Sequence, residues 1–165
     1  MIDRCGRNID YLRISVTDRC NLRCIYCMPE EGIRLTEREK ILQEPEIIRV
    51  CKVMAELGIT KIKLTGGEPL VRPRIPGLIR QIKEISGIEK VTLTTNGILL
   101  KDQMQDLADA GLDSLNISLD TLDEECFCKI TRRNLLEETL EGIREAMKYP
   151  EVQLKINCVP LGMEE

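Results

Sequence analysis

The chain has 165 residues, a length that suits one domain with a hydrophobic core of its own. Its 24 Lys and Arg against 28 Asp and Glu give a formal charge of -4, which argues against a basic nucleic-acid-binding protein. No apolar run approaches membrane-spanning length, and residues 1–10 lack the apolar core of a secretory signal. We therefore expect a cytoplasmic protein without a membrane partner, whose eight cysteines are metal ligands or core residues rather than disulfides.

Apolar periodicity predicts strands and helices in alternation along the chain. Strands are expected at 11–17, 61–67, 90–97, 114–120 and 152–159, and helices at 44–58, 74–87, 101–111 and 135–148. The mixed charges of segment 122–138 favour a largely solvated helical region. Strict alternation of this kind is typical of an α/β fold, in which parallel strands are joined by right-handed crossovers.

The distinctive short motifs all follow predicted strands: "TDRCNLRC" at 17–24, "TGGEP" at 65–69, "TTNG" at 94–97 and "SLDT" at 118–121. Parallel strands bring their carboxyl ends to one edge, where β/α barrels build their sites. We therefore expect the four motifs to form one site. Lys155 and Asn157 of the fifth strand are two positions apart and so share one face of the sheet.

Three cysteines, Cys20, Cys24 and Cys27, form a C-x3-C-x2-C pattern in a polar loop, where residues of the hydrophobic core are not expected. A structural zinc site needs four ligands, and Cys126 or Cys128 could supply the fourth, so zinc stays open. A 4Fe-4S cluster held by three thiolates leaves one iron without a protein ligand, where a small molecule can bind.

The other cysteines are expected to be structural. Cys51 lies on the apolar stripe of a predicted helix and Cys158 in a predicted strand, so both are expected in the core. One of Cys126 and Cys128 is expected to pack inward.

The stretch "CNLRCIYC", with Tyr26 before the last cysteine, resembles the signature of the radical S-adenosylmethionine (SAM) superfamily, and "TGGEP" resembles its glycine motif. The longer stretches "YLRISVTDRCNLRCIYCMPEEG", "KIKLTGGEPLVR", "TTNG", "SLNISLDTL" and "KITRRN" resemble the N-terminal part of the GTP 3′,8-cyclase family of molybdenum cofactor biosynthesis.

This resemblance implies a partial (β/α) barrel of the radical SAM type with about five parallel strands. Residues 1–165 would form one radical SAM core domain, truncated after the fifth strand. An electron from the cluster would cleave SAM to a 5′-deoxyadenosyl radical. That radical would start the cyclisation of GTP to (8S)-3′,8-cyclo-7,8-dihydroguanosine 5′-triphosphate, a lyase reaction. The family's second, C-terminal 4Fe-4S cluster is absent from these residues, so we expect the chain to lack full activity.

The resemblance also implies the site residues. Cys20, Cys24 and Cys27 would bind the cluster. The residues implied to bind SAM are Tyr26, Gly66, Gly67, Ser118 and Asn157, and those implied to bind GTP are Arg13, Lys63, Thr94 and Lys155.

Several of these residues have structural interpretations as well. Arg13 could face solvent from an alternating strand, and Gly66 with Gly67 could simply form a turn. Lys63 stands where the family often has Arg, and a lysine lacks the two-pronged guanidinium contact. Arg132 and Arg133 are not assigned as ligands.

The implied partners are GTP and an electron donor such as flavodoxin or ferredoxin, and a homodimer is compatible with the family. Two alternatives remain open from the sequence. One is another radical SAM enzyme, such as a peptide-modifying maturase, which would share the cysteine motif. The other is a non-catalytic zinc-binding domain.

Overall fold

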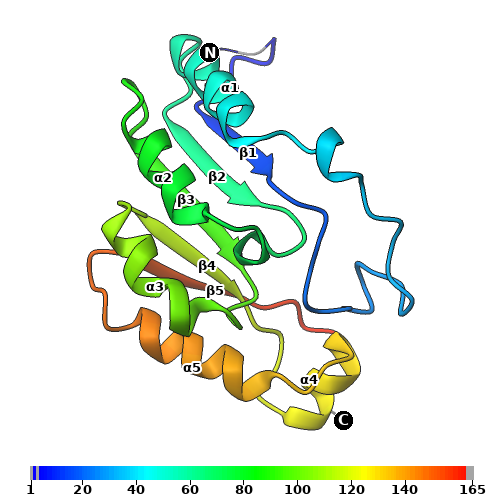
Figure 1. Ribbon diagram of the computed structural model, residues 1–165. Coiled ribbons are helices and arrows are strands. Elements are labelled where there is room, and N and C mark those ends of the chain that lie inside the picture. The colour runs from blue at the N-terminus through cyan, green and yellow to red at the C-terminus, as the bar shows by residue number, and fades with distance from the viewer. Residues whose placement is uncertain (1, 3, 163–165) are drawn as a thin grey trace.

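The computed structural model describes residues 2 and 4–162, and its centre is a sheet of five parallel strands in the order β1-β2-β3-β4-β5 (Figure 1). The strands are β1 (Tyr11–Ser15), β2 (Lys61–Thr65), β3 (Lys90–Thr95), β4 (Ser114–Ser118) and β5 (Gln153–Asn157). The predicted α/β class and the five parallel strands are confirmed. Within the described residues β1 and β5 are not paired with each other, so the strands form an open arc.

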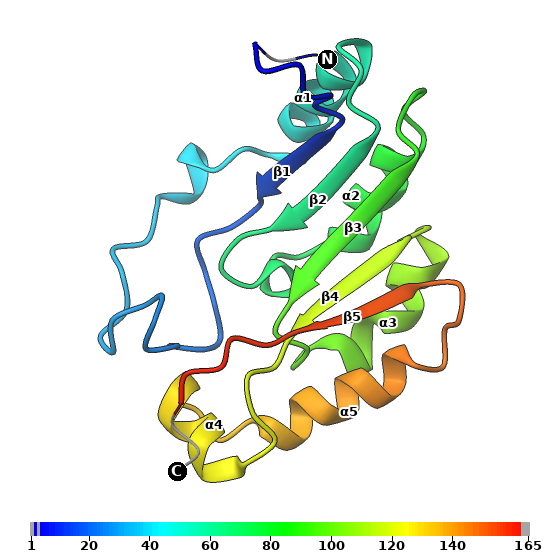
Figure 2. The same ribbon diagram turned by 180° about the vertical axis from the view of Figure 1, so that it is seen from behind.

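In the described part of the chain five α-helices connect the strands: α1 (Glu44–Glu56), α2 (Ile75–Lys83), α3 (Leu100–Asp109), α4 (Glu124–Thr131) and α5 (Leu136–Ala146). Two short 3-10 helices lie at Arg38–Lys40 and Pro69–Val71. Because each new strand is added on the same side of the previous one, right-handed crossovers place the helices on one face of the sheet. Figure 2 shows the opposite face without a helix across it. No helix in the described ranges is long and apolar enough to cross a membrane.

The two faces of the sheet differ in polarity. Toward the helices the strands bury apolar side chains, including Ile62, Leu64, Val91, Leu93, Leu115 and Ile117. The alternate positions form what we call the polar face: Arg13, Ser15, Lys63, Thr65, Thr92, Thr94, Asn116, Ser118, Lys155 and Asn157. Parallel sheets are usually apolar on both faces because both are covered. The polar face therefore borders a wet space rather than a second core.

The helices bury apolar stripes against the sheet, and Cys51 of α1 is fully buried among them, as predicted. Of the pair on α4, Cys126 is buried and Cys128 is exposed, so the inward packing of one is confirmed. The prediction for Cys158 is wrong. Strand β5 ends at Asn157, and Cys158 is exposed beyond the end of this edge strand.

Segment 122–138 is expected to be largely solvated, and most of its residues are exposed, but α4 also has a buried side that was not expected. Its inward side buries Cys126, Phe127 and Ile130. Phe127 packs with Leu119 and Leu136 in a small second core beside the main one. The charged residues of this short helix obscure its narrow apolar side, which is why the sequence pattern did not indicate that this side is buried.

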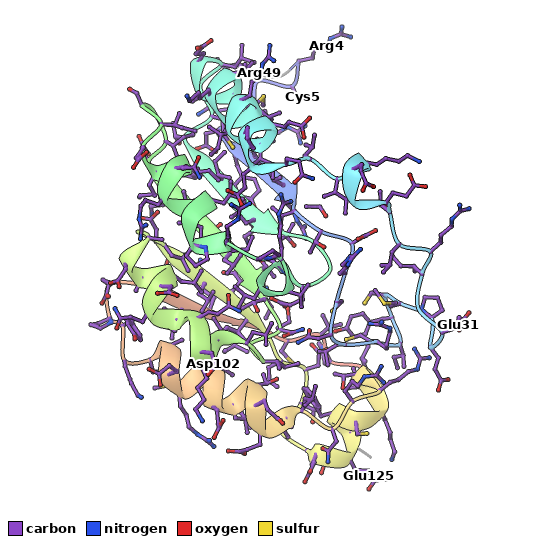
Figure 3. All side chains as sticks on the ribbon, viewed as in Figure 1. Arg4, Cys5, Glu31, Arg49, Asp102 and Glu125 are labelled. Atoms are coloured by element: carbon purple, nitrogen blue, oxygen red, sulfur yellow. The ribbon has the colours of Figure 1, made fainter. Side chains whose placement is uncertain are left out.

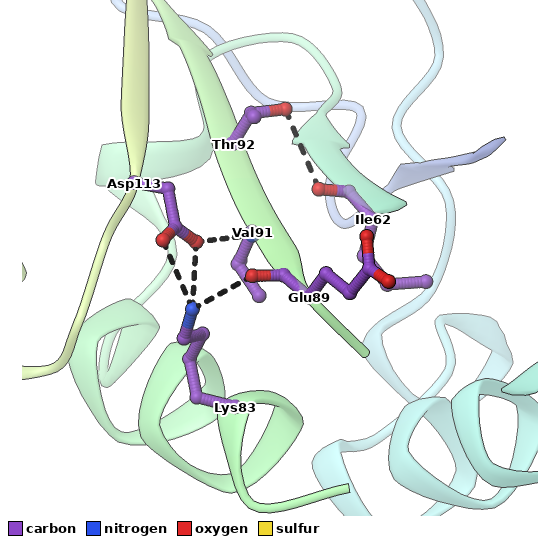
Figure 4. A network of polar contacts seen from close by, with 6 residues as sticks. All are labelled: Ile62, Lys83, Glu89, Val91, Thr92 and Asp113. Carbon is purple, nitrogen blue, oxygen red and sulfur yellow. Dashed lines mark hydrogen bonds and ion pairs between the residues drawn. The ribbon is translucent and has the colours of Figure 1, made fainter. Parts of the chain in front are cut away.

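The amino ends of the central strands are joined by a polar network around Lys83 at the end of α2 (Figure 4). Its Nζ donates to both carboxylate oxygens of Asp113, at 3.0 and 2.9 Å, and to the Glu89 carbonyl at 3.1 Å. Asp113 also accepts from the Val91 N–H at 2.7 Å. This network stabilises the edge opposite the motif-bearing one, a division of roles typical of β/α barrels.

Residues 16–43, which we call the cysteine loop, continue the pairing between β1 and β2 beyond the strand ends. The Gly67 N–H donates to the Thr17 carbonyl and the Glu68 N–H to the Arg19 carbonyl, both at 2.7 Å. A Cβ on Gly66 would overlap the Thr17 backbone, and one on Gly67 would overlap the Arg19 carbonyl. The two glycines are therefore more than a turn, because they allow the loop to pack directly on the end of β2.

The same loop is also held by α4. The Arg23 N–H donates to the Thr131 carbonyl at 3.0 Å and the Ile25 N–H to the Ile130 carbonyl at 2.9 Å. These bonds satisfy carbonyls at the end of the helix that have no partner within it. Arg132, with a left-handed φ of 57°, turns its Nη1 back to the carbonyls of Arg23 and Met28, both at 3.0 Å.

The close approach at Gly67 predicts that Gly67→Ala destabilises the protein by roughly 1–3 kcal/mol, because the Arg19 carbonyl must move. Gly77→Ala is the matched control, since Gly77 is helical and has open space around its Cα. It should stabilise the protein by about 0.5–1 kcal/mol. Urea unfolding of both variants checks the difference, and equal stability of the two would contradict the packing described.

The Arg132 contacts predict that Arg132→Gly, which keeps the left-handed backbone free of strain, loosens the cysteine loop. Losing a charged donor to two carbonyls should speed hydrogen exchange of the Arg23 and Ile25 amides by about tenfold or more. Arg133→Ala is the control, because among the described residues the Arg133 guanidinium donates a hydrogen bond only to the neighbouring Arg132 carbonyl. Unchanged exchange in Arg132→Gly would show that backbone pairing alone holds the loop.

Candidate active site

The carboxyl ends of the strands and the cysteine loop meet on one side of the molecule (Figures 1 and 2). Cys20 and Cys24 are half-buried there and Cys27 is exposed. The N–H groups of Cys27 and Met28 both donate to the Cys24 carbonyl, at 3.1 and 2.9 Å, in a tight turn. Cys5 lies at the other end of the molecule from Glu125 of α4 (Figure 3).

The three thiols are close enough to influence one another electrostatically. Burial raises the pKa of the Cys24 thiol to about 11, and the neighbouring thiols of Cys27 and Cys20 contribute to the rise. Burial likewise raises the pKa of Cys20, again with a contribution from Cys27. A bound metal would favour the thiolate form of all three.

The three thiols lie near one another without converging on a single point in the described residues. In the part of the chain that the structure describes, no group of three or more His, Cys, Asp or Glu side chains converges tightly enough to hold one metal ion. Neither Cys126 nor Cys128 completes a four-ligand site there. A 4Fe-4S cluster places each thiolate on a different iron, so its ligands stand farther apart than those of a zinc ion.

A hollow of about 40 Å³ beside Cys24 brings together several segments, and its walls include Tyr26, Asn96, Ser118 and Asp120. Two residues predicted to bind SAM, Tyr26 and Ser118, thus lie next to a predicted cluster ligand. Asn157 lies opposite Ser118 in the register of β4 and β5. Gly66 and Gly67 lie where the cysteine loop packs on β2.

Asp120 fixes the position of Tyr26, a role that the sequence analysis did not assign. The Tyr26 hydroxyl donates to Asp120 Oδ2 at 2.7 Å, and Asp120 Oδ1 accepts from the Val159 N–H at 2.9 Å. Burial and this carboxylate raise the pKa of Tyr26 well above its usual range, so the phenol stays a neutral donor. The position of Asp120 in "SLDT", directly after a strand, is the sequence feature that could have indicated a role in the site.

The residues predicted to bind GTP lie together on the polar face. Arg13 is paired with Lys63 in the register of β1 and β2, and Asn116 links Thr94 to Lys155 across β3, β4 and β5. Burial, Arg13 and Lys155 lower the pKa of Lys63. Within the described residues, none of the three cationic side chains forms an ion pair with a carboxylate. The arrangement is a concentration of positive charge suited to an anion.

Glu68 of "TGGEP" and Asn96 of "TTNG" are hydrogen-bonded to each other, and the sequence patterns gave neither residue a role in the site. The Glu68 side chain is 1% exposed, and its carboxylate accepts from Leu70 N at 3.0 Å, Thr95 Oγ1 at 2.7 Å and Asn96 N at 2.7 Å. Burial raises the pKa of Glu68, and these donors oppose the rise. Glu68 therefore joins the end of β2 to the end of β3.

Residues 14–164 match the family model of the radical SAM superfamily. A GTP 3′,8-cyclase of Peptoclostridium acidaminophilum is 51% identical over 98% of this chain and 50% of its own length. Molybdenum cofactor biosynthesis protein 1 of Dictyostelium discoideum is 48% identical over 96% of this chain and 25% of its own length. The chain thus spans about half the length, or less, of the curated relatives it matches.

Among solved structures, SuiB of Streptococcus suis bound to its precursor peptide SuiA superposes with a TM-score of 0.75. The match covers 90% of this chain and 32% of SuiB, at 22% identity, and shows the fold alone. The family implies a 4Fe-4S cluster and SAM as cofactors, for which the three thiols of the cysteine loop are a fitting donor set. On the sequence match and the shared fold, the chain belongs to the radical SAM superfamily.

Proposed function

We propose that the chain forms the radical-generating part of a GTP 3′,8-cyclase of molybdenum cofactor biosynthesis. The observation that carries the proposal is the cationic group of Arg13, Lys63 and Lys155 on the polar face, which forms no ion pair with a carboxylate among the described residues. The identity of 48% to 51% to curated relatives bearing these names supports the same activity.

In this proposal Cys20, Cys24 and Cys27 hold a 4Fe-4S cluster that has one open iron. Bound there with SAM, the cluster would supply the one-electron cleavage that starts radical chemistry on GTP. The SAM contacts are assigned to Tyr26, Gly66, Gly67, Ser118 and Asn157. The hydrogen bond from Tyr26 to Asp120 would keep the aromatic ring in one orientation beside the cofactor.

The triphosphate of GTP is assigned to Arg13, Lys63 and Lys155, with Thr94 as a further contact. Burial lowers the pKa of Lys63, and repulsion from Arg13 and Lys155 adds to this effect; a bound polyanion would offset the repulsion. Lysine at this position provides a point charge without the planar fork of arginine, so it would contact one phosphate oxygen at a time.

The same proposal includes an electron donor such as flavodoxin or ferredoxin and a second 4Fe-4S cluster in the C-terminal half of the full-length protein. It also includes a homodimer. The peptide-bound structural neighbour does not favour a peptide-modifying maturase, because at 22% identity it shares only the fold. The much higher identity to the cyclases favours GTP.

The proposal predicts that the full-length protein, reduced and supplied with SAM and GTP deuterated at C3′, transfers deuterium into 5′-deoxyadenosine. Mass spectrometry of the nucleoside product measures the transfer. Cleavage of SAM without deuterium transfer would contradict the choice of GTP as substrate while leaving the radical SAM assignment intact.

The cationic group predicts that Lys63→Ala raises the KM for GTP by about tenfold or more, since a charged hydrogen bond to phosphate is lost. Lys61→Ala is the matched control, because Lys61 lies on the same strand but is paired with Asp10 at 2.8 Å. Steady-state kinetics of the full-length protein with varied GTP check both variants. Equal KM values for the two would exclude Lys63 from the substrate site.

A further inference from the structure

We infer that Asn96 is a positioning residue for Cys20, and that its side-chain N–H acts as a hydrogen-bond donor to the Cys20 sulfur and raises the reduction potential of the centre bound there. The inference rests on the proposed role of Cys20 as a cluster ligand. It concerns two motifs, "TGGEP" and "TTNG", whose polar residues Glu68 and Asn96 have no role in the proposed function.

The contact joins segments far apart in the sequence. Asn96 Nδ2 lies 3.9 Å from Cys20 Sγ and donates to Asn21 Oδ1 at 2.7 Å. The same sulfur accepts from the Leu22 N–H at 3.4 Å. Cys20 thus has one donor from its own loop and one from the end of β3.

The orientation of the Asn96 amide is determined by its other contact. Its Oδ1 accepts from the Ile98 N–H at 3.2 Å. Only the amide oxygen can accept this hydrogen bond, because the NH₂ group is a donor. The NH₂ group must therefore face the cysteine loop, where Asn21 and Cys20 offer acceptors. The hydrogen-bond network as a whole therefore makes Asn96 Nδ2 a donor to the Cys20 sulfur.

Glu68 holds Asn96 in this position. Its buried carboxylate accepts from the Asn96 backbone N–H and from the hydroxyl of Thr95, each at 2.7 Å. The Thr95 hydroxyl in turn accepts from the Gly97 N–H at 3.1 Å. The backbone on both sides of Asn96 is thereby fixed to the end of β2, which leaves the amide little freedom to move away from Cys20.

Hydrogen bonds to the sulfurs of an iron–sulfur cluster are among the factors that set its potential. A donor withdraws negative charge from the thiolate and so stabilises the reduced, more negative state of the centre. Removing the Asn96 donor should therefore make the centre harder to reduce, whereas a merely structural role would change its occupancy and leave the potential unaltered.

The test is a redox titration of the full-length protein, reconstituted anaerobically and followed by the electron paramagnetic resonance signal that responds to SAM. Asn96→Asp keeps an acceptor for Ile98 but loses the donor, and Asn96→Leu has similar shape and no charge. Both should retain the iron of this centre, and both should show a more negative midpoint potential. Gln103→Leu is the control and should leave the midpoint unchanged, because Gln103 donates to the Leu70 carbonyl away from the sulfurs.

An unchanged midpoint in either iron-containing variant would overturn the inference. A shift in Asn96→Asp alone would assign the effect to the added charge, and loss of iron from both variants would make Asn96 structural only. Because the titration uses no GTP, its outcome is independent of deuterium transfer, so failure of the cyclase proposal and failure of this inference can be told apart.

Discussion

The close packing of the cysteine loop on the end of β2 is the constraint on which the rest of the site depends. Two backbone hydrogen bonds, from Gly67 to Thr17 and from Glu68 to Arg19, join the segments at distances that any side chain on Gly66 or Gly67 would prevent. The same turn carries Glu68, whose buried carboxylate extends the connection to β3. A loop rich in polar residues thereby acquires a fixed position without a core of its own.

The order of the strands leaves a polar, positively charged face of the sheet uncovered near this loop. Helices α1, α2, α3 and α5 cover one face of the sheet, and the opposite face is not covered by a helix. Polar residues such as Lys63 and Lys155, which are unusual in a parallel sheet, project from that opposite face. The site thus combines a ligand-binding loop at the strand ends with a charged surface along the strands. The helix α4, through Arg132, holds the loop from the other side.

The sequence predicted the elements well because apolar periods of two and 3.6 residues are strong in the strands and in most helices. It predicted one common site because motifs after parallel strands must meet at one edge. It missed the burial of α4, where charges conceal a narrow apolar side, and it misplaced Cys158, since the end of an edge strand has no periodic signal. The distant partners of Arg132, Asp120 and Asn96 could not be predicted, because single-sequence patterns carry no information on contacts such as those with Arg23, Tyr26 and Asn21, which are 75 to 109 residues away along the chain.

The central claim is that three thiolates of one docked loop hold an iron–sulfur cluster with a vacant iron site for SAM. Electron paramagnetic resonance of the reduced full-length protein, with and without SAM, tests it directly when compared with Cys24→Ala. The account predicts a signal that changes on addition of SAM and is lost in the variant. A zinc-containing, colourless protein, or an iron signal indifferent to both SAM and the loss of Cys24, would contradict it.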